Sequence, residues 1–265
     1  MNFDLLVTFL LPVITGAVYF FMALKIKQTG KYRAILFGEI GFKKLEFAYI
    51  LFGIYFITRP LQNFLGPHPM PMMINSARQF FLMAIIAPSI LSAIFHWVPS
   101  PGGAPKTAKF ASYVVGVLMG IIFVLVNSIA VKDHAIIYSN EFITAYDPLW
   151  FVGNAYVVQL IIIHLICQFV APVGFLLLAA AYVRHRRHHY ELSSVYDLMP
   201  RKLRYLEASL MIFAFSFIIA GGAVVFGKYY TFVWAIYFIG AIIAAIVELK
   251  SILMPPRSNP ADLKN

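Results

Sequence analysis

Charged residues are scarce in this chain, and cysteine is almost absent. Asp, Glu, Lys and Arg together make up 12% of the 265 residues, whereas a soluble domain carries about 25%. The single cysteine, Cys167, excludes an internal disulfide and a cysteine-rich metal site. Hydrophobic residues make up 61% of the chain, and the mean hydropathy is +0.81. One soluble core cannot bury so much apolar surface, so the sequence predicts an integral membrane protein of the cell or inner membrane.

Acidic residues are fewer than basic ones, 11 against 21, which gives a net charge of +10. In a soluble protein this charge would suggest a nucleic-acid partner. Here the basic residues form short clusters between long apolar runs, a pattern typical of membrane orientation and of contact with anionic lipids of the inner leaflet. We therefore expect a lipid partner and no nucleic acid.

Several motifs of known chemistry are missing from the sequence. It contains no G-x-S-x-G, no H-E-x-x-H and no P-loop. The last apolar run has no lysine near its middle that could carry a retinal Schiff base. The N-terminus has Asp4 and lacks the basic region of a cleavable signal, so it is expected to be a first transmembrane helix.

Long apolar runs dominate what is present. A helix needs about 20 apolar residues to cross about 30 Å of hydrocarbon. We predict an all-α, polytopic bundle of seven transmembrane helices in residues 1–254, followed by a short polar cytoplasmic tail, 255–265. The expected spans are residues 4–24, 46–65, 73–97, 110–131, 150–183, 205–227 and 229–253.

The basic residues also predict the orientation of these spans. If the N-terminus is outside, 17 of the 21 Lys and Arg residues fall on the inner side. Six of them lie in the single loop 184–204. Because Lys and Arg accumulate on the cytoplasmic side, the pattern favours an outer N-terminus and an inner C-terminus.

Polar residues inside the predicted spans gather near their outer ends. Ionisable groups in a membrane are costly and often functional, and arginine forks bind carboxylate or phosphate. We therefore predict an outward-facing pocket for a small anionic or amphiphilic ligand. Its candidate ligand-binding residues are Arg59, Gln62, Asn63, Arg78, Gln79, Asn154 and Gln159. The alternative is that both arginines extend to lipid headgroups and the amides cap helix ends.

The histidines do not predict a cofactor. His164 lies in the fifth run with Gln168 one turn later, and an interhelical hydrogen bond explains such a pair. The string H-x-x-H-H at 185–189 resembles a histidine box of membrane di-iron enzymes and of fatty-acid elongases. It is interleaved with arginines, whose charge disfavours a bound cation. We expect no metal and no catalytic residue.

Two further groups complete the predicted sites. Gly116 and Gly120 form a G-x-x-x-G surface for helix packing. The inner loop offers an interaction surface for a cytoplasmic or membrane protein partner through Arg184, Arg186, Arg187, Arg201 and Lys202. The leading hypothesis is a sensor or receptor-like module that signals through these basic loops. The alternatives are a non-catalytic subunit of a larger membrane complex, and a transporter or lipid-metabolism protein.

Overall fold

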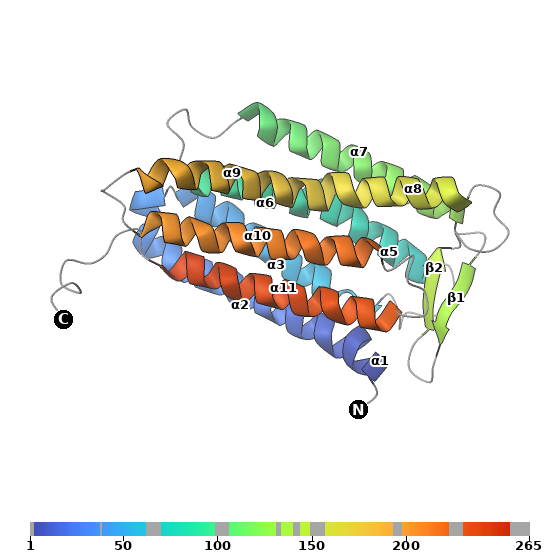
Figure 1. Ribbon diagram of the computed structural model, residues 1–265. Coiled ribbons are helices and arrows are strands. Elements are labelled where there is room, and N and C mark those ends of the chain that lie inside the picture. The colour runs from blue at the N-terminus through green and yellow to red at the C-terminus, as the bar shows by residue number, and fades with distance from the viewer. Residues whose placement is uncertain are drawn as a thin grey trace.

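The computed structural model shows an elongated bundle of long helices with a small β-hairpin at one end (Figure 1). The structure describes residues 3–37, 39–61, 70–98, 106–130, 134–139, 144–148, 157–192, 198–222 and 230–254. In the first half of the chain the helical elements are α1 (Phe3–Leu5), η1 (Leu6–Leu10), α2 (Leu11–Phe37), α3 (Glu39–Ile57), α5 (Met70–Phe81), η2 (Leu82–Ile86), α6 (Ala87–Trp97) and α7 (Lys106–Ala130). They are followed by α8 (Val157–Gln168), η3 (Phe169–Val173), α9 (Gly174–Glu191), α10 (Met199–Gly222) and α11 (Tyr230–Leu253).

The elements labelled η are single π-helical turns that join α-helices into longer rods. In η3, Pro172 lies inside the turn. Proline has no backbone N–H and cannot make the regular α-helical bond, so a wider local turn lets the rod continue. The sequence predicts one long transmembrane span over 150–183. In the structure, α8, η3 and α9 together form one continuous rod in this region.

Among the described residues, six helical rods are long and apolar enough to cross a membrane. They are Leu6–Thr29, Met73–Trp97, Lys106–Val126, Val158–Glu191, Met199–Gly221 and Thr231–Leu253. The prediction of a helical, multi-pass membrane protein is confirmed at this level. The remaining long helix, α3, begins at Glu39, seven residues before the predicted span, and carries Lys43, Lys44 and Glu46 in its first two turns.

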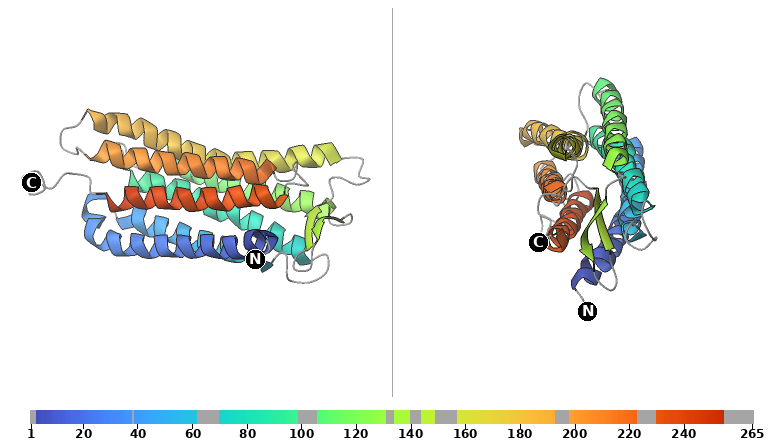
Figure 2. Two further views of the ribbon diagram at one scale, coloured as in Figure 1. Left: turned by 60° about the horizontal axis from the view of Figure 1, so that its bottom comes forward. Right: turned by 90° about the vertical axis from the view of Figure 1, so that its right-hand side faces the viewer.

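The helices close into a ring around an aromatic core. α2 packs on α3, α3 on α6, α6 on α9, α9 on α10, α10 on α11, and α11 on α2 (Figure 2). α7 lies outside this ring against α5, η2 and α8. Inside the ring, Tyr19 stacks on Phe56 with 5.4 Å between ring centroids and on Phe213 with 5.8 Å.

The first helix begins and the last helix finishes at opposite ends of the bundle (Figures 1 and 2). α1 begins at the end that carries the hairpin, and α11 finishes at the other end. The hairpin pairs β1 (His134–Ser139) with β2 (Thr144–Pro148) in antiparallel register, with an irregularity between Ile136 and Tyr138. The sequence predicted an all-α protein, so the two strands of this hairpin were not expected.

Candidate functional site

Arg78 lies inside the bundle near the hairpin end, where it connects α5 to α3. Only 7% of its surface is exposed. Its Nε and Nη2 donate hydrogen bonds to the Tyr55 carbonyl oxygen at 3.2 and 2.7 Å, and Nε also donates to Thr58 Oγ1 at 3.2 Å. The guanidinium carbon lies 4.4 Å from the centroid of the Tyr55 ring. These contacts hold the guanidinium between α5 and α3.

Gln79 extends this polar contact to a third rod. Its Nε2 donates to the Tyr55 hydroxyl at 3.2 Å, and its Oε1 accepts a hydrogen bond from Gln168 Nε2 at 3.2 Å. All three side chains are buried, between 6% and 7% exposed. Interhelical hydrogen bonds of this kind fix the relative rotation of helices in an apolar bundle. Gln79 of α5 therefore joins the tyrosine of α3 to the amide of Gln168 on α8.

Arg59 connects the end of α3 to α11. It is 6% exposed, and its guanidinium carbon lies 4.1 Å from the centroid of the Trp234 ring. The buried hydroxyl of Tyr237 interacts electrostatically with both Arg59 and Arg78. Two cations thus lie within the same buried region, each covered by an aromatic face. Their burial shows that neither side chain is directed mainly to the surrounding lipid.

An apolar groove runs along the outside of this polar region, between α3 and the α5–η2 rod. It encloses about 420 Å³. Three of its lining residues, Ile54, Leu61 and Phe81, are 47%, 44% and 53% exposed, so the groove opens onto the outer face of the bundle. The lining residues are Leu51, Ile54, Tyr55, Thr58, Leu61, Ile74, Ala77, Arg78, Phe81, Ile85 and Ile86. Arg78 therefore belongs both to the buried polar region and to the wall of this groove.

The other predicted pocket residues fall into two groups. Gln62, Asn63 and Asn154 lie outside the described residues. Gln159 is described and lies exposed on α8, and it is not among the residues that line the groove. It stands nine residues before Gln168. At about 100° per residue, that spacing puts the two side chains on opposite faces of the helix, and the structure buries the Gln168 face.

The structure adds four residues that the sequence analysis did not select for the pocket: Tyr55, Gln168, Trp234 and Tyr237. The sequence does indicate an interhelical contact for Gln168, because Gln168 follows His164 by one turn and such a pair predicts an interhelical hydrogen bond. The observed bond joins Gln168 to Gln79, while the His164 ring packs on Phe123 with 4.8 Å between centroids. Aromatic residues are common throughout the chain, so nothing in the sequence marks the three that contact the polar region.

Gly116 and Gly120 lie where α7 crosses α5 and η2. A Cβ added to Gly116 would overlap the backbone oxygen of Met83 and would lie 3.0 Å from Pro88 Cγ. A Cβ on Gly120 would lie 2.9 Å from the Phe80 ring. The two glycines thus allow the peripheral helix to approach the bundle of the same chain closely.

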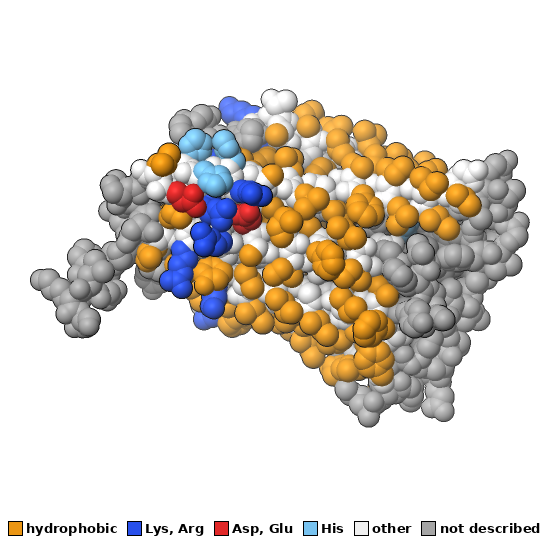
Figure 3. All heavy atoms as spheres, viewed as in Figure 1, with side chains coloured by type: hydrophobic (Ala, Val, Ile, Leu, Met, Phe, Trp, Pro, Cys, Tyr) orange, Lys and Arg blue, Asp and Glu red, His pale blue; other side chains and the backbone are white. Residues whose placement is uncertain are grey.

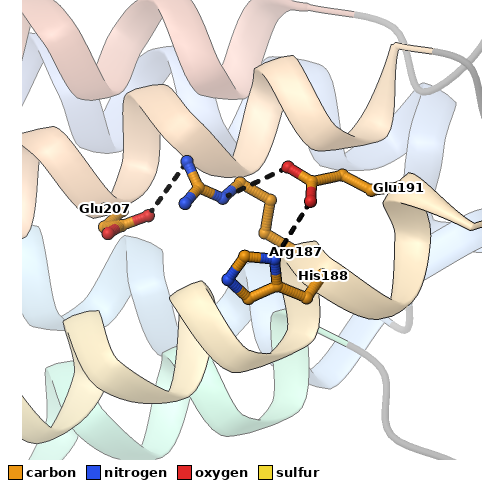
Figure 4. A network of polar contacts seen from close by, with 4 residues as sticks. All are labelled: Arg187, His188, Glu191 and Glu207. Atoms are coloured by element: carbon orange, nitrogen blue, oxygen red, sulfur yellow. Dashed lines mark hydrogen bonds and ion pairs between the residues drawn. The ribbon is translucent and has the colours of Figure 1, made fainter.

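Basic side chains gather at the end of the bundle opposite the hairpin (Figure 3). Arg184 and Arg201 are exposed there. Arg187 forms an ion pair with Glu207 of α10 at 3.4 Å and another with Glu191 at 3.8 Å, and His188 contacts the same Glu191 at 3.0 Å (Figure 4). This network ties the last turns of α9 to α10.

Two of the predicted interaction residues are not on this surface. Lys202 is 1% exposed, and its Nζ donates to the carbonyl oxygens of Met254 at 2.9 Å and Ile252 at 3.5 Å. It therefore caps the C-terminal end of α11, where the helix leaves carbonyl groups without helical partners. Arg186 is 8% exposed, with its guanidinium 5.6 Å from the Tyr190 ring. Both are structural contacts of the bundle, which corrects their predicted availability to a partner.

Within the described ranges, no three His, Cys, Asp or Glu side chains come together as a metal site would require. The search for relatives also gives no assignment. The chain matches no protein-family model, no curated protein and no solved structure. A functional conclusion must therefore come from the geometry of the site.

Proposed function

We propose that this chain is a seven-span, receptor-like membrane protein that binds an anionic amphiphile at the groove beside Arg78. The observation that carries the proposal is the position of Arg78, a buried cation that forms part of the wall of an outward-opening apolar groove. An amphiphile has the two matching parts, an apolar chain for the groove and a negative head for the guanidinium.

In this proposal α3 crosses the membrane in addition to the six rods described above, which makes seven spans. The N-terminus is then outside and the C-terminus inside. The charged first turns of α3 lie at the basic end, where Lys44 Nζ donates to Ser92 Oγ of α6 at 3.0 Å. The uncharged part from Phe47 to Ile57 then covers roughly 16 Å at 1.5 Å per residue, and further residues continue toward Arg59. The basic end of the bundle becomes the cytoplasmic end, and the groove opens in the outer half.

The charge of the head group should decide which amphiphile binds. A chain that moves from the bilayer into the groove leaves one apolar environment for another, so its transfer contributes little free energy. A carboxylate or phosphate that reaches the Arg78 guanidinium gains a charge-assisted contact at low dielectric. The groove should therefore bind an amphiphile with an anionic head more tightly than one with a neutral head and the same chain length.

Binding at this place would act on the contact between α3 and α5. Arg78 of α5 holds the Tyr55 carbonyl of α3, so an anion that draws the guanidinium toward the groove weakens that interhelical bond. The same α3 reaches the cytoplasmic end, where Arg184 and Arg201 are exposed to anionic lipid or to a protein partner. In this proposal α3 transmits the binding event to the basic surface.

Ligand-dependent stabilisation of the purified protein in neutral detergent tests the proposal. A long-chain carboxylate should raise the unfolding temperature, and the uncharged alcohol of the same chain length should not. Ile54→Trp fills the groove and should abolish the stabilisation. Ile246→Trp is the matched control, because Ile246 lies on α11 and is also exposed, at 58% against 47% for Ile54. Equal stabilisation by carboxylate and alcohol, or an unchanged response of Ile54→Trp, would contradict the proposal.

A further inference from the structure

A second buried polar group lies toward the basic end of the bundle, well away from the groove. Glu248 of α11 is 5% exposed and faces α10 and α3. Its Oε2 lies 3.2 Å from Ser209 Oγ, and the Tyr49 hydroxyl of α3 faces the same carboxyl. Its Oε1 is buried with no hydrogen-bond partner within the described residues. An ionised carboxylate in such surroundings is costly unless it is paired.

The hydrogen positions around Ser209 decide the state of this carboxyl. Ser209 Oγ lies 2.8 Å from the Ala244 carbonyl oxygen and 3.2 Å from Glu248 Oε2. A serine hydroxyl has one hydrogen, and a carbonyl oxygen can only accept. With that hydrogen in the shorter bond to Ala244, a second hydrogen must lie between Ser209 Oγ and Glu248 Oε2. A proton on the carboxyl supplies it, and the acid then donates to the serine oxygen.

The charged and titratable groups around Glu248 do not replace this proton. Tyr19 of α2 and Tyr49 of α3 are phenols, and each is 2% exposed or less. Lys202 of α10 is directed to the Met254 carbonyl, and Lys250 lies 5.5 Å from the Tyr205 ring. The ion pairs within the described residues do not include Glu248.

We infer that Glu248 is held as a neutral carboxylic acid and forms a proton-binding site between α3, α10 and α11. Loss of the proton would leave Glu248 Oε2 facing the Ser209 oxygen, whose hydrogen the Ala244 carbonyl holds, and Oε1 buried without a hydrogen-bond partner within the described residues. The three helices would then have to separate or admit a cation. The site is distinct from the groove, because Tyr49, Ser209 and Glu248 do not line it and Glu248 lies in the last turns of α11, toward the basic end.

Infrared difference spectroscopy of the purified protein at neutral pH tests this inference directly. The wild type should show the C=O stretch of a protonated carboxylic acid that shifts in heavy water. Glu248→Gln should lose the band, and Glu248→Asp should shift it. Glu207→Gln is the matched control, because Glu207 is ion-paired with Arg187, and it should keep the band. A spectrum in which neither Glu248 variant changes this band would overturn the inference, as would loss of a carboxylate band instead.

Stability gives a second readout, because glutamine has the shape of the protonated acid and can donate to Ser209. Because the unfolded chain releases this proton above about pH 4.3, the unfolding temperature of the wild type relative to that of Glu248→Gln should fall as the pH is raised from there, until the folded protein also releases the proton. A wild type that is stabilised by sodium ions at neutral pH would assign the site to a bound cation and overturn the proton-binding inference.

Discussion

The guanidinium of Arg78 binds Tyr55 twice, through a 2.7 Å hydrogen bond to its carbonyl oxygen and through a 4.4 Å approach to its ring. The Tyr55 carbonyl lies in the last turn of α3, where the Arg59 N–H donates to the Phe56 carbonyl, and Arg78 supplies a donor to it from a neighbouring rod. The bond therefore couples the rotation of α5 to that of α3. Because the same guanidinium forms part of the groove wall, the occupancy of the groove and the packing of these helices are physically linked.

The first prediction concerns the close approach of α7. Gly116→Ala should destabilise the protein by about 1–3 kcal/mol, because the added methyl group overlaps the Met83 backbone oxygen, which cannot move as a side chain could. Thermal unfolding in detergent measures the effect. Gly221→Ala is the control, since its added Cβ would lie 3.8 Å from Gln168 Cβ, an ordinary contact. Equal stability of the two variants would mean that α7 packs less tightly than described.

The second prediction concerns Lys202. Lys202→Met should lower the free energy of unfolding by about 1–3 kcal/mol, because it leaves the carbonyl oxygens of Met254 and Ile252 without this charged donor. Arg204→Met, two residues further along α10 and exposed, should have an effect within about 0.5 kcal/mol. Denaturation of both variants under the same conditions makes the comparison. A greater loss in the Arg204 variant would contradict the assigned capping role.

The third prediction concerns the ion pair between α9 and α10. Arg187 and Glu207 are 14% and 19% exposed, and their closest atoms are 3.4 Å apart. A double-mutant cycle with Arg187→Met and Glu207→Gln should give a coupling free energy of about 0.5–1 kcal/mol, which falls as salt is added. A coupling that does not depend on salt would argue for packing of the side chains as its source.

The fourth prediction concerns topology. A reporter that is active only in the cytoplasm should be active when fused after residue 195 or after residue 265, and silent after residue 140. The physical reason is the accumulation of basic residues at the end of the bundle where α9 finishes and α10 begins. Activity of the fusion after residue 140 would contradict the seven-span arrangement with α3 as a span.

Helical spacing predicted much of the bundle but only part of the site. Arg78 and Gln79 are neighbours on α5, and the sequence predicted both for the site because polar residues recur near the ends of several apolar runs. Gln159 met the same criterion and is exposed. Depth along a helix can be read from a sequence, whereas the direction of a side chain around the axis depends on which neighbour the helix packs against.

Lys202 shows the same limit at the other end of the bundle. Its charge placed it with the basic loop, yet it lies on the buried face of α10 with Leu206 and Ser209, four and seven residues later. That periodicity is present in the sequence and would have predicted burial. Counting basic residues predicts an orientation in the membrane, but it does not separate a lysine that caps a helix from one that faces water.

The central claim is that Arg78 recognises the head of an anionic amphiphile, and equilibrium binding to Arg78→Met measures it most directly. The wild type and the variant are titrated with the same long-chain carboxylate in neutral detergent, and Arg204→Met serves as a control that also removes one basic residue. Loss of a charge-assisted hydrogen bond, about 1.5–3 kcal/mol, should weaken binding of the carboxylate by roughly ten- to 150-fold in Arg78→Met alone. Equal affinity of all three folded proteins for the carboxylate would contradict the account.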